Sequence, residues 1–213
     1  MPKTLIQTQL SLMLLVLLTA CGVKVGAIHS VDADRPVAAD MGSVVGKIQF
    51  IVDGKLLKYN LLNRPLMRLF RFPDSHYYES PMVNADGTFA WALPEGGYEI
   101  AVLFGGMSPV GQPIYMRDTD VFWRVNGFTY PGYRFSVGPG EVHYLGTLTV
   151  DVTSRKMNAI IDFTGERVFD SLNNMQVTDE SATDSMWQAL KSRPGAGIGL
   201  FERFTFLPES TQP

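Results

Sequence analysis

Apolar and polar residues alternate with a period of two along most of the chain between residues 42 and 163. In residues 43–52 this alternation places on one face Val44, Gly46, Ile48, Phe50 and Val52. A period of two indicates a β-strand with one buried face. The same period predicts strands at residues 66–72 and 141–152, and Asp53-Gly54 is a strong signal for a tight turn. Strands at this spacing, separated by Gly and Pro turns, are typical of a β-sandwich.

The stretch ADGTFAWALPEGGYEI, residues 85–100, gives the clearest hairpin pattern of the chain. Asp86-Gly87 and residues 94–97 predict two turns around an alternating run. The side chains expected to face inward here are Phe89, Trp91, Leu93, Tyr98, Ile100, Val102 and Phe104. On the later strand, the same reasoning assigns one shared face to Val142, Tyr144, Leu148, Val150 and Val152.

The C-terminal part, residues 164–213, changes to a helical period. Ala182, Met186 and Leu190 recur at helical spacing, after the acidic pair Asp179-Glu180 and before Pro194-Gly195. Acidic residues favour a helix N-terminus and Pro-Gly ends a helix, so one short helix is predicted over residues 179–192. Residues 198–207 are apolar enough for a final strand. Whether that strand joins the sandwich or packs separately stays open.

The first twenty residues have the pattern of a targeting segment. Lys3 supplies a positive charge, and residues 10–18 (LSLMLLVLL) form an apolar run. A secretory apolar region has about 7–15 residues, whereas a membrane-spanning helix needs about 20. Residues 1–20 are therefore expected to be a signal peptide that does not belong to the fold. Residues 21–41 mix small, acidic and apolar types without a period and are expected to form a flexible tether.

Cys21, the only cysteine, directly follows Leu18-Thr19-Ala20. This stretch resembles the lipobox of bacterial lipoproteins, in which the cysteine thiol is acylated and the cysteine becomes the new N-terminus. The resemblance implies a diacylglyceryl group on Cys21, in many bacteria with a third, amide-linked chain such as palmitate. Two or more acyl chains hold a protein firmly on a membrane. Gly22, at the next position, resembles outer-membrane sorting in Gram-negative bacteria. An ordinary signal peptide with a cysteine near the cut is the alternative.

The pattern D-G-x-F-x-x-x-L-P-x-G-x-Y-x-I in residues 86–100 resembles the carboxypeptidase regulatory-like domains. The likeness extends over residues 42–152. It implies a prealbumin-like (transthyretin-like) antiparallel β-sandwich, here over residues 42–163, followed by a C-terminal extension with the short helix. Such domains mostly serve as structural, adhesive or binding modules, and the resemblance brings no catalytic residues with it.

Charge and cysteine content narrow the function further. The formal net charge is −3, and loss of Lys3 with the signal peptide makes it more negative, which argues against a nucleic-acid partner. With Cys21 committed to lipid, the mature chain has no disulfide even in an oxidising compartment. Stability must therefore come from the hydrophobic core.

Signatures of catalysis and metal binding are weak. The three histidines, His29, His76 and His143, are far apart and have no neighbours at the spacing of metal ligands, so neither a metal site nor a cofactor is expected. The sequence contains neither a G-x-S-x-G elbow nor a G-x-x-x-x-G-K-[ST] loop.

One covalent hypothesis concerns an isopeptide bond of the kind formed in collagen-adhesin B-type repeats, which share the sandwich fold. It would join Lys47 to Asn158 with the help of a buried acid, either Glu99 or Asp162. Lys47 falls on the polar face of its predicted strand, and the local motif of that family around the acid is missing.

Residues 105–133 are rich in Gly, Pro and aromatic residues, and loops of this length are often functional. Tyr115, Phe128 and Tyr130 are the best candidates for a binding surface, with packing onto the sandwich as the alternative. We therefore expect a membrane-anchored cell-envelope lipoprotein with a non-catalytic binding or structural role through a protein partner. A glycan-binding module that uses residues 105–133 is the second hypothesis, and an enzyme of unrecognised type is the third.

Overall fold

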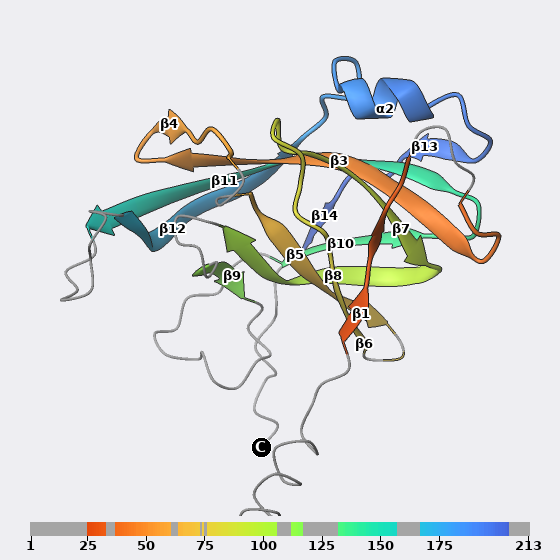
Figure 1. Ribbon diagram of the computed structural model, residues 1–213, viewed down its shortest axis with the longest axis horizontal. Helices are drawn as coiled ribbons and strands as arrows, with labels where there is room; N and C mark the ends of the chain where they lie inside the picture. The colour runs from red at the N-terminus through yellow and green to blue at the C-terminus, as the bar shows by residue number, and fades with distance from the viewer. Residues whose placement is uncertain are drawn as a thin grey trace, which may run out of the picture.

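The computed structural model describes residues 25–32, 37–60, 64–72, 74, 76–105, 112–116, 132–156 and 167–204. This part of the chain is mainly β-strand, arranged as two facing sheets with one short helix (Figure 1). The predicted fold class, a mainly β sandwich with a short C-terminal helix, is confirmed. Most strand pairs are antiparallel as expected, but both sheets also contain parallel pairs and are therefore mixed.

The first sheet, called sheet A, has the strand order β1-β6-β5-β8-β10-β14, with β9 beside β8. Its strands are β1 (Val25–Ala27), β5 (Leu66–Phe72), β6 (His76–Glu79), β8 (Gly96–Gly105), β9 (Gln112–Met116), β10 (Gly132–Val137) and β14 (Glu202–Phe204). The strand predicted at residues 66–72 is thus β5.

The second sheet, sheet B, has the order β12-β11-β3-β7-β2, with β4 beside β3 and β13 beside β11. Its strands are β2 (His29–Ser30), β3 (Met41–Val52), β4 (Lys55–Leu56), β7 (Thr88–Pro94), β11 (Val142–Lys156), β12 (Arg167–Thr178) and β13 (Ala196–Ile198). The two long central strands, β3 and β11, run parallel although they are about a hundred residues apart in sequence; the Gln49 side chain donates to the Thr149 hydroxyl across this pair.

One core fills the space between the sheets. It includes the predicted inward residues Phe89, Trp91 and Leu93, whose rings and side chains are almost fully buried. The Tyr133 hydroxyl of β10 donates to the Met175 carbonyl of β12 at 2.6 Å, so a hydrogen bond joins sheet A to sheet B across the core. The burial of these apolar side chains supplies the stability that a chain without disulfides requires.

A bulge in β8 changes the inward face that the sequence predicts there. Ile100 pairs with Leu69, and Val102 pairs with Arg68, so Ala101 has no partner on β5. One extra residue moves every following side chain to the other face. Leu103 therefore joins the core instead of Val102, and the assignment of Val102 to the inner face is wrong.

A second bulge interrupts β11 around Gly146, which has φ +88°. Leu145, Leu148, Val150 and Val152 face the core between the sheets, whereas Val142 and Tyr144 face the opposite side of sheet B. The prediction that all five apolar residues of this strand share one face is therefore wrong for Val142 and Tyr144.

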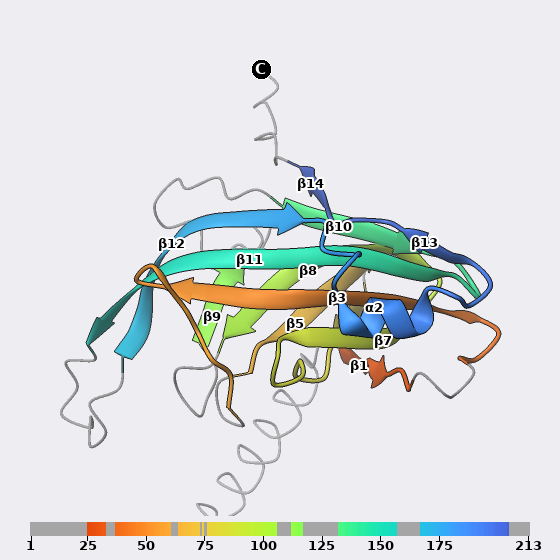
Figure 2. The same ribbon diagram turned by 90° about the horizontal axis from the view of Figure 1, so that it is seen from above.

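The helix α2 (Ser185–Leu190) covers the outer face of sheet B (Figure 2). It begins later than predicted because Asp184 is its N-cap and accepts a hydrogen bond from the Trp187 amide at 2.8 Å. Trp187 and Leu190 pack with Val45 and Tyr144 in a second, smaller core. Sheet B is thus covered on both faces at this end, which explains why adjacent residues of β3 are both buried.

Both ends of the described chain cross from one sheet to the other. Residues 25–30 pair with β6 of sheet A as β1 and then with β7 of sheet B as β2, and Ile28 between them is 6 % exposed. Residues 196–204 do the same on the opposite side, as β13 on β11 and β14 on β10, with Phe201 buried between them. The first segment closes one lateral edge of the sandwich, and the second closes the other edge beside residues 142–144 of β11, which β12 does not pair with.

This closure overturns one expectation and answers one question that the sequence left open. Residues 25–30 are expected to belong to a flexible tether, yet they form strands. The Ile28 side chain is buried and the Ile28 amide donates a hydrogen bond to the Glu79 carbonyl, and these contacts hold the segment on the sheets. The strand predicted at the C-terminus joins the sandwich rather than packing separately, and it does so in both sheets.

Candidate functional site

The aromatic binding candidates fall mostly outside the part that the structure describes. Phe128 and Tyr130 lie outside the described residues, as does the lipidation candidate Cys21. Tyr115 belongs to β9, where its backbone pairs with Leu103 of β8, and the position of its side chain is not described. These three aromatic residues therefore remain predictions.

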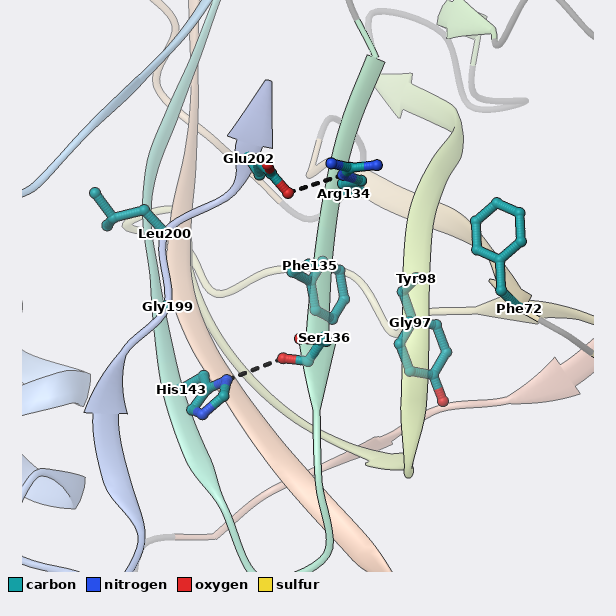
Figure 3. A pocket seen from close by; sticks show the side chains of 10 residues that line it. All are labelled: Phe72, Gly97, Tyr98, Arg134, Phe135, Ser136, His143, Gly199, Leu200 and Glu202. Carbon is teal, nitrogen blue, oxygen red and sulfur yellow. Dashed lines mark hydrogen bonds and ion pairs between the residues drawn. The ribbon is translucent and has the colours of Figure 1, made fainter. Parts of the chain in front are cut away.

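A groove with a volume of about 530 Å³ opens along β10 on sheet A. Figure 3 shows it between β8 on one side and the segment that leads from β13 to β14 on the other. It is lined by Phe72, Gly97, Tyr98, Arg134, Phe135, Ser136, His143, Gly199, Leu200 and Glu202. None of these residues was singled out from the sequence as a binding residue.

Buried aromatic rings of the main core support the groove from below. The Tyr98 and Phe135 rings stack with centroids 5.4 Å apart, and the Phe135 ring also makes an edge contact with Phe201. The Tyr98 hydroxyl donates to the Pro94 carbonyl at 2.6 Å, and burial raises the pKa of this hydroxyl. Beside it, a Cβ placed on Gly97 would meet nothing within 4 Å, so Gly97 leaves open space.

The two long walls carry exposed apolar side chains. Phe72, at the end of β5, is 44 % exposed, and Leu200, between β13 and β14, is 37 % exposed. They lie on opposite sides of the groove (Figure 3). Exposed large apolar side chains that flank a hollow are the usual anchoring points for a partner.

A charged pair stands at one end of the groove. The Arg134 Nε atom donates to Glu202 Oε2 at 2.8 Å, and the guanidinium lies 5.4 Å from the centroid of the Phe204 ring. The hydrogen bond and the charge of Glu202 raise the pKa of Arg134, and the same bond lowers the pKa of Glu202. Both side chains are more than half exposed, so solvent screens the pair and it contributes little stability.

His143 stands at the other end, on β11. Its Nδ1 atom donates to the Ser136 carbonyl at 2.9 Å, and its Nε2 atom lies 3.3 Å from Glu141 Oε2. A serine, a histidine and a glutamate thus lie together, but the histidine contacts the serine backbone and not its hydroxyl. A catalytic triad requires the hydroxyl to be activated by the imidazole, so this arrangement differs from a triad.

Other chemistry is limited in the described residues. They contain no group of three or more His, Cys, Asp and Glu side chains that could hold a metal ion. His29 and His76 are exposed on β2 and β6. Within the same residues, no helix has the length and apolar content required to cross a membrane.

The isopeptide hypothesis loses one of its two acids. Lys47 follows Gly46 on β3 and points away from the core, since its neighbour Ile48 belongs to the core, and Glu99 lies between the core residues Tyr98 and Ile100 on β8. Lys47 and Glu99 are therefore on the outer faces of opposite sheets, and Glu99 cannot assist a bond made by Lys47. Asn158 and Asp162 lie outside the described residues.

Comparisons of this chain with protein-family models, with curated proteins and with solved structures find no match. The class that the fold and the groove define is a β-sandwich protein with an open, mixed apolar and charged groove.

Proposed function

We propose that this protein is a lipid-anchored cell-envelope lipoprotein with a non-catalytic binding role, and that it binds a protein partner in the groove along β10. The anchor is supported by the signal segment and Cys21. The observation that carries the binding role is the groove itself, in which exposed Phe72 and Leu200 flank the open space above Gly97.

A protein partner fits the groove better than a small molecule does. Apolar side chains at the centre with charged groups at the rim are the usual composition of a protein interface. Here Phe72 and Leu200 supply the apolar part, and the Arg134–Glu202 pair and His143 supply the polar ends. Small-molecule sites enclose most of their ligand, whereas this groove is partly open to solvent.

A glycan ligand is the second candidate. The exposed Phe72 ring offers a flat face of the kind on which sugars stack, and it lies on the same sheet as β9, which contains Tyr115. Retention of the protein on envelope polysaccharide, lost in Phe128→Ala or Tyr130→Ala, is expected under this candidate and not under the first.

The anchor is tested by the mass of the purified protein. We expect a mature chain that starts at Cys21 and carries acyl chains, and incorporation of a palmitate analogue that Cys21→Ala abolishes. A cleaved chain without added mass would contradict the anchor and leave an ordinary secreted protein.

The groove is tested by photo-crosslinking in intact cells. A photoreactive amino acid at Leu200 should capture one protein partner, whereas the same amino acid at Leu56, which is 63 % exposed on β4 of the other sheet, should not. Gly97→Leu should remove the crosslink because it fills the groove. Gly197→Leu is the matched control, since a Cβ there also meets nothing within 4 Å and Gly197 does not line the groove. Equal crosslinking from Leu200 and Leu56 would contradict the proposal.

A further inference from the structure

Only a short stretch of chain separates the proposed lipid anchor at Cys21 from the first described strand, β1. Val25, the first residue that the structure describes, already lies opposite Tyr77 on β6. Only Gly22, Val23 and Lys24 separate it from Cys21. A chain spans at most about 3.6 Å per residue, so the Cα atoms of Cys21 and Val25 can be no more than about 14 Å apart.

This short span fixes which part of the sandwich is nearest to the lipid. β1 runs parallel to β6 and is the outermost strand of sheet A. The chain before Val25 therefore leaves the sheet at the end where β5 passes into β6. The helix α2 lies beyond sheet B, on the other side of the molecule (Figure 1).

Apolar side chains gather at this same end of sheet A. Val25, Tyr77 and Phe70 are cross-strand partners in one row, so their side chains share a face. That face is the outer one, because Leu69, which is adjacent to Phe70 and therefore points to the opposite face, belongs to the core. The Phe70 ring makes edge contacts with Phe72 and Tyr77, at centroid distances of 4.9 and 5.2 Å. We call these four residues the anchor-end patch: Val25, Phe70, Phe72 and Tyr77.

The patch is partly exposed to solvent, and its four side chains are uncharged. Val25 is 42 % exposed and Phe72 is 44 % exposed. Arg71, the residue between Phe70 and Phe72 in the chain, is paired with Asp74 at 3.0 Å. Aromatic and aliphatic side chains of this kind partition into the boundary between lipid headgroups and acyl chains, and they need no anionic lipid to do so.

We infer that the anchor-end patch rests on the lipid surface, so that the β1–β6 edge of sheet A lies at the membrane and α2 points away from it. Phe72, which belongs to both the patch and the groove, then lies where the lipid meets the partner in the groove. The inference rests on the proposed lipidation of Cys21, which places residue 21 at the headgroups. The occupant of the patch is the bilayer, because an acylated Cys21 at the headgroups holds Val25 within about 14 Å of the lipid.

The test uses the full-length lipidated protein in phosphatidylcholine vesicles that contain a doxyl-labelled lipid quencher. Cys21 is the only native cysteine and is acylated, so a second cysteine can be labelled alone with an environment-sensitive fluorophore. Phe72→Cys reports on the patch. Leu56→Cys is the matched control, because it is an exposed apolar residue on sheet B. We expect quenching at residue 72 to exceed that at residue 56 by at least about threefold.

A second variant separates contact from simple tethering. A flexible Gly/Ser insertion of about 15 residues after Lys24 should leave the protein on the vesicles and reduce the difference between the two labels, because the anchor then no longer forces the patch onto the lipid. Equal quenching at residues 72 and 56 in vesicle-bound protein would overturn the inference while the anchor stands. Protein that stays off the vesicles and lacks acyl mass would overturn the anchor, and with it the inference.

Discussion

Replacing Ile28 by alanine tests whether the N-terminal strand pair is an integral part of the sandwich. Ile28 joins β1 to β2, is 6 % exposed and belongs to the main core. Truncation of a buried isoleucine to alanine costs about 2–5 kcal/mol of unfolding free energy. Ile28 lies at a sheet edge, where neighbours can close part of the cavity, so we expect the lower end of that range, about 2–3 kcal/mol.

The matched control is Ile198→Ala in β13, at the opposite edge of the sandwich. Ile198 is 57 % exposed, so its truncation should change the unfolding free energy by less than about 0.5 kcal/mol. For a domain of this size, about 1 kcal/mol corresponds to 2–4 °C, which predicts a melting temperature about 5–10 °C lower for the Ile28 variant.

Urea unfolding in detergent micelles, followed by tryptophan fluorescence, measures the difference, because Trp91 and Trp187 are both buried. Hydrogen exchange adds a local reading. The Ile28 amide donates to the Glu79 carbonyl and the Val31 amide donates to the Ala90 carbonyl, so both should exchange slowly in the native protein. Equal midpoints for the two isoleucine variants, together with fast exchange at these amides, would refute the reasoning and return residues 25–31 to a tether.

Three further changes probe other contacts, and each is read from urea midpoints. Tyr133→Phe should cost about 1–2 kcal/mol, because it leaves the buried Met175 carbonyl without its donor; no change would show that this bond does not join the sheets. Gly146→Ala should cost about 1–3 kcal/mol, because φ is +88° and the new Cβ would lie 2.8 Å from the Thr178 carbonyl oxygen; Gly197→Ala, in open space, is the control and should be near neutral. Burial opposes ionisation of Asp86, but the hydroxyl and amide of Thr88 donate to its carboxylate and leave its pKa lowered. A carboxyl with a lowered pKa stabilises the fold above its unfolded pKa, near 3.9, and this stability is lost as the pH falls through the folded pKa. Asp86→Asn should therefore be less stable than the native protein at pH 7, with the gap closing below about pH 4; a gap independent of pH would contradict the assignment.

The strands were predictable because their signal is local. The period of two in residues 43–52 arises because one face of β3 must be buried, and Asp53 and Gly54 both adopt positive φ, 51° and 77°, as a tight hairpin turn requires. The period of two gave the wrong inner face in β8 and β11, where a bulge of one extra residue moves the following side chains to the opposite face of the strand. Around Gly146, the neighbouring apolar residues Tyr144 and Leu145 followed by a glycine were a usable sign of a bulge. At Ala101 the sequence carries no comparable sign.

The groove was not predictable because its parts come together only in three dimensions. Phe72 and Leu200 are 128 positions apart, and nothing near either residue in the sequence relates one to the other. In the sequence, Arg134 has the pattern of an ordinary residue on the solvent-exposed face of a strand, because its partner Glu202 lies 68 positions away. The short strands β1 and β2 were missed because three residues and two residues are too few to show a period.

The closure of both lateral edges by the two chain ends sets an order for assembly of the sandwich. A chain that emerges from its N-terminus can pair β1 with β6 early, but β3 must wait about a hundred residues for its parallel partner β11, and β10 stays unpaired on one side until β14 arrives. Distant parallel pairing is slow, and an open strand edge invites association with other chains. The last residues of the described chain therefore cover the edge of the sandwich at β10. A chain cut before Ala196 would keep this strand edge unpaired and open to association with other chains.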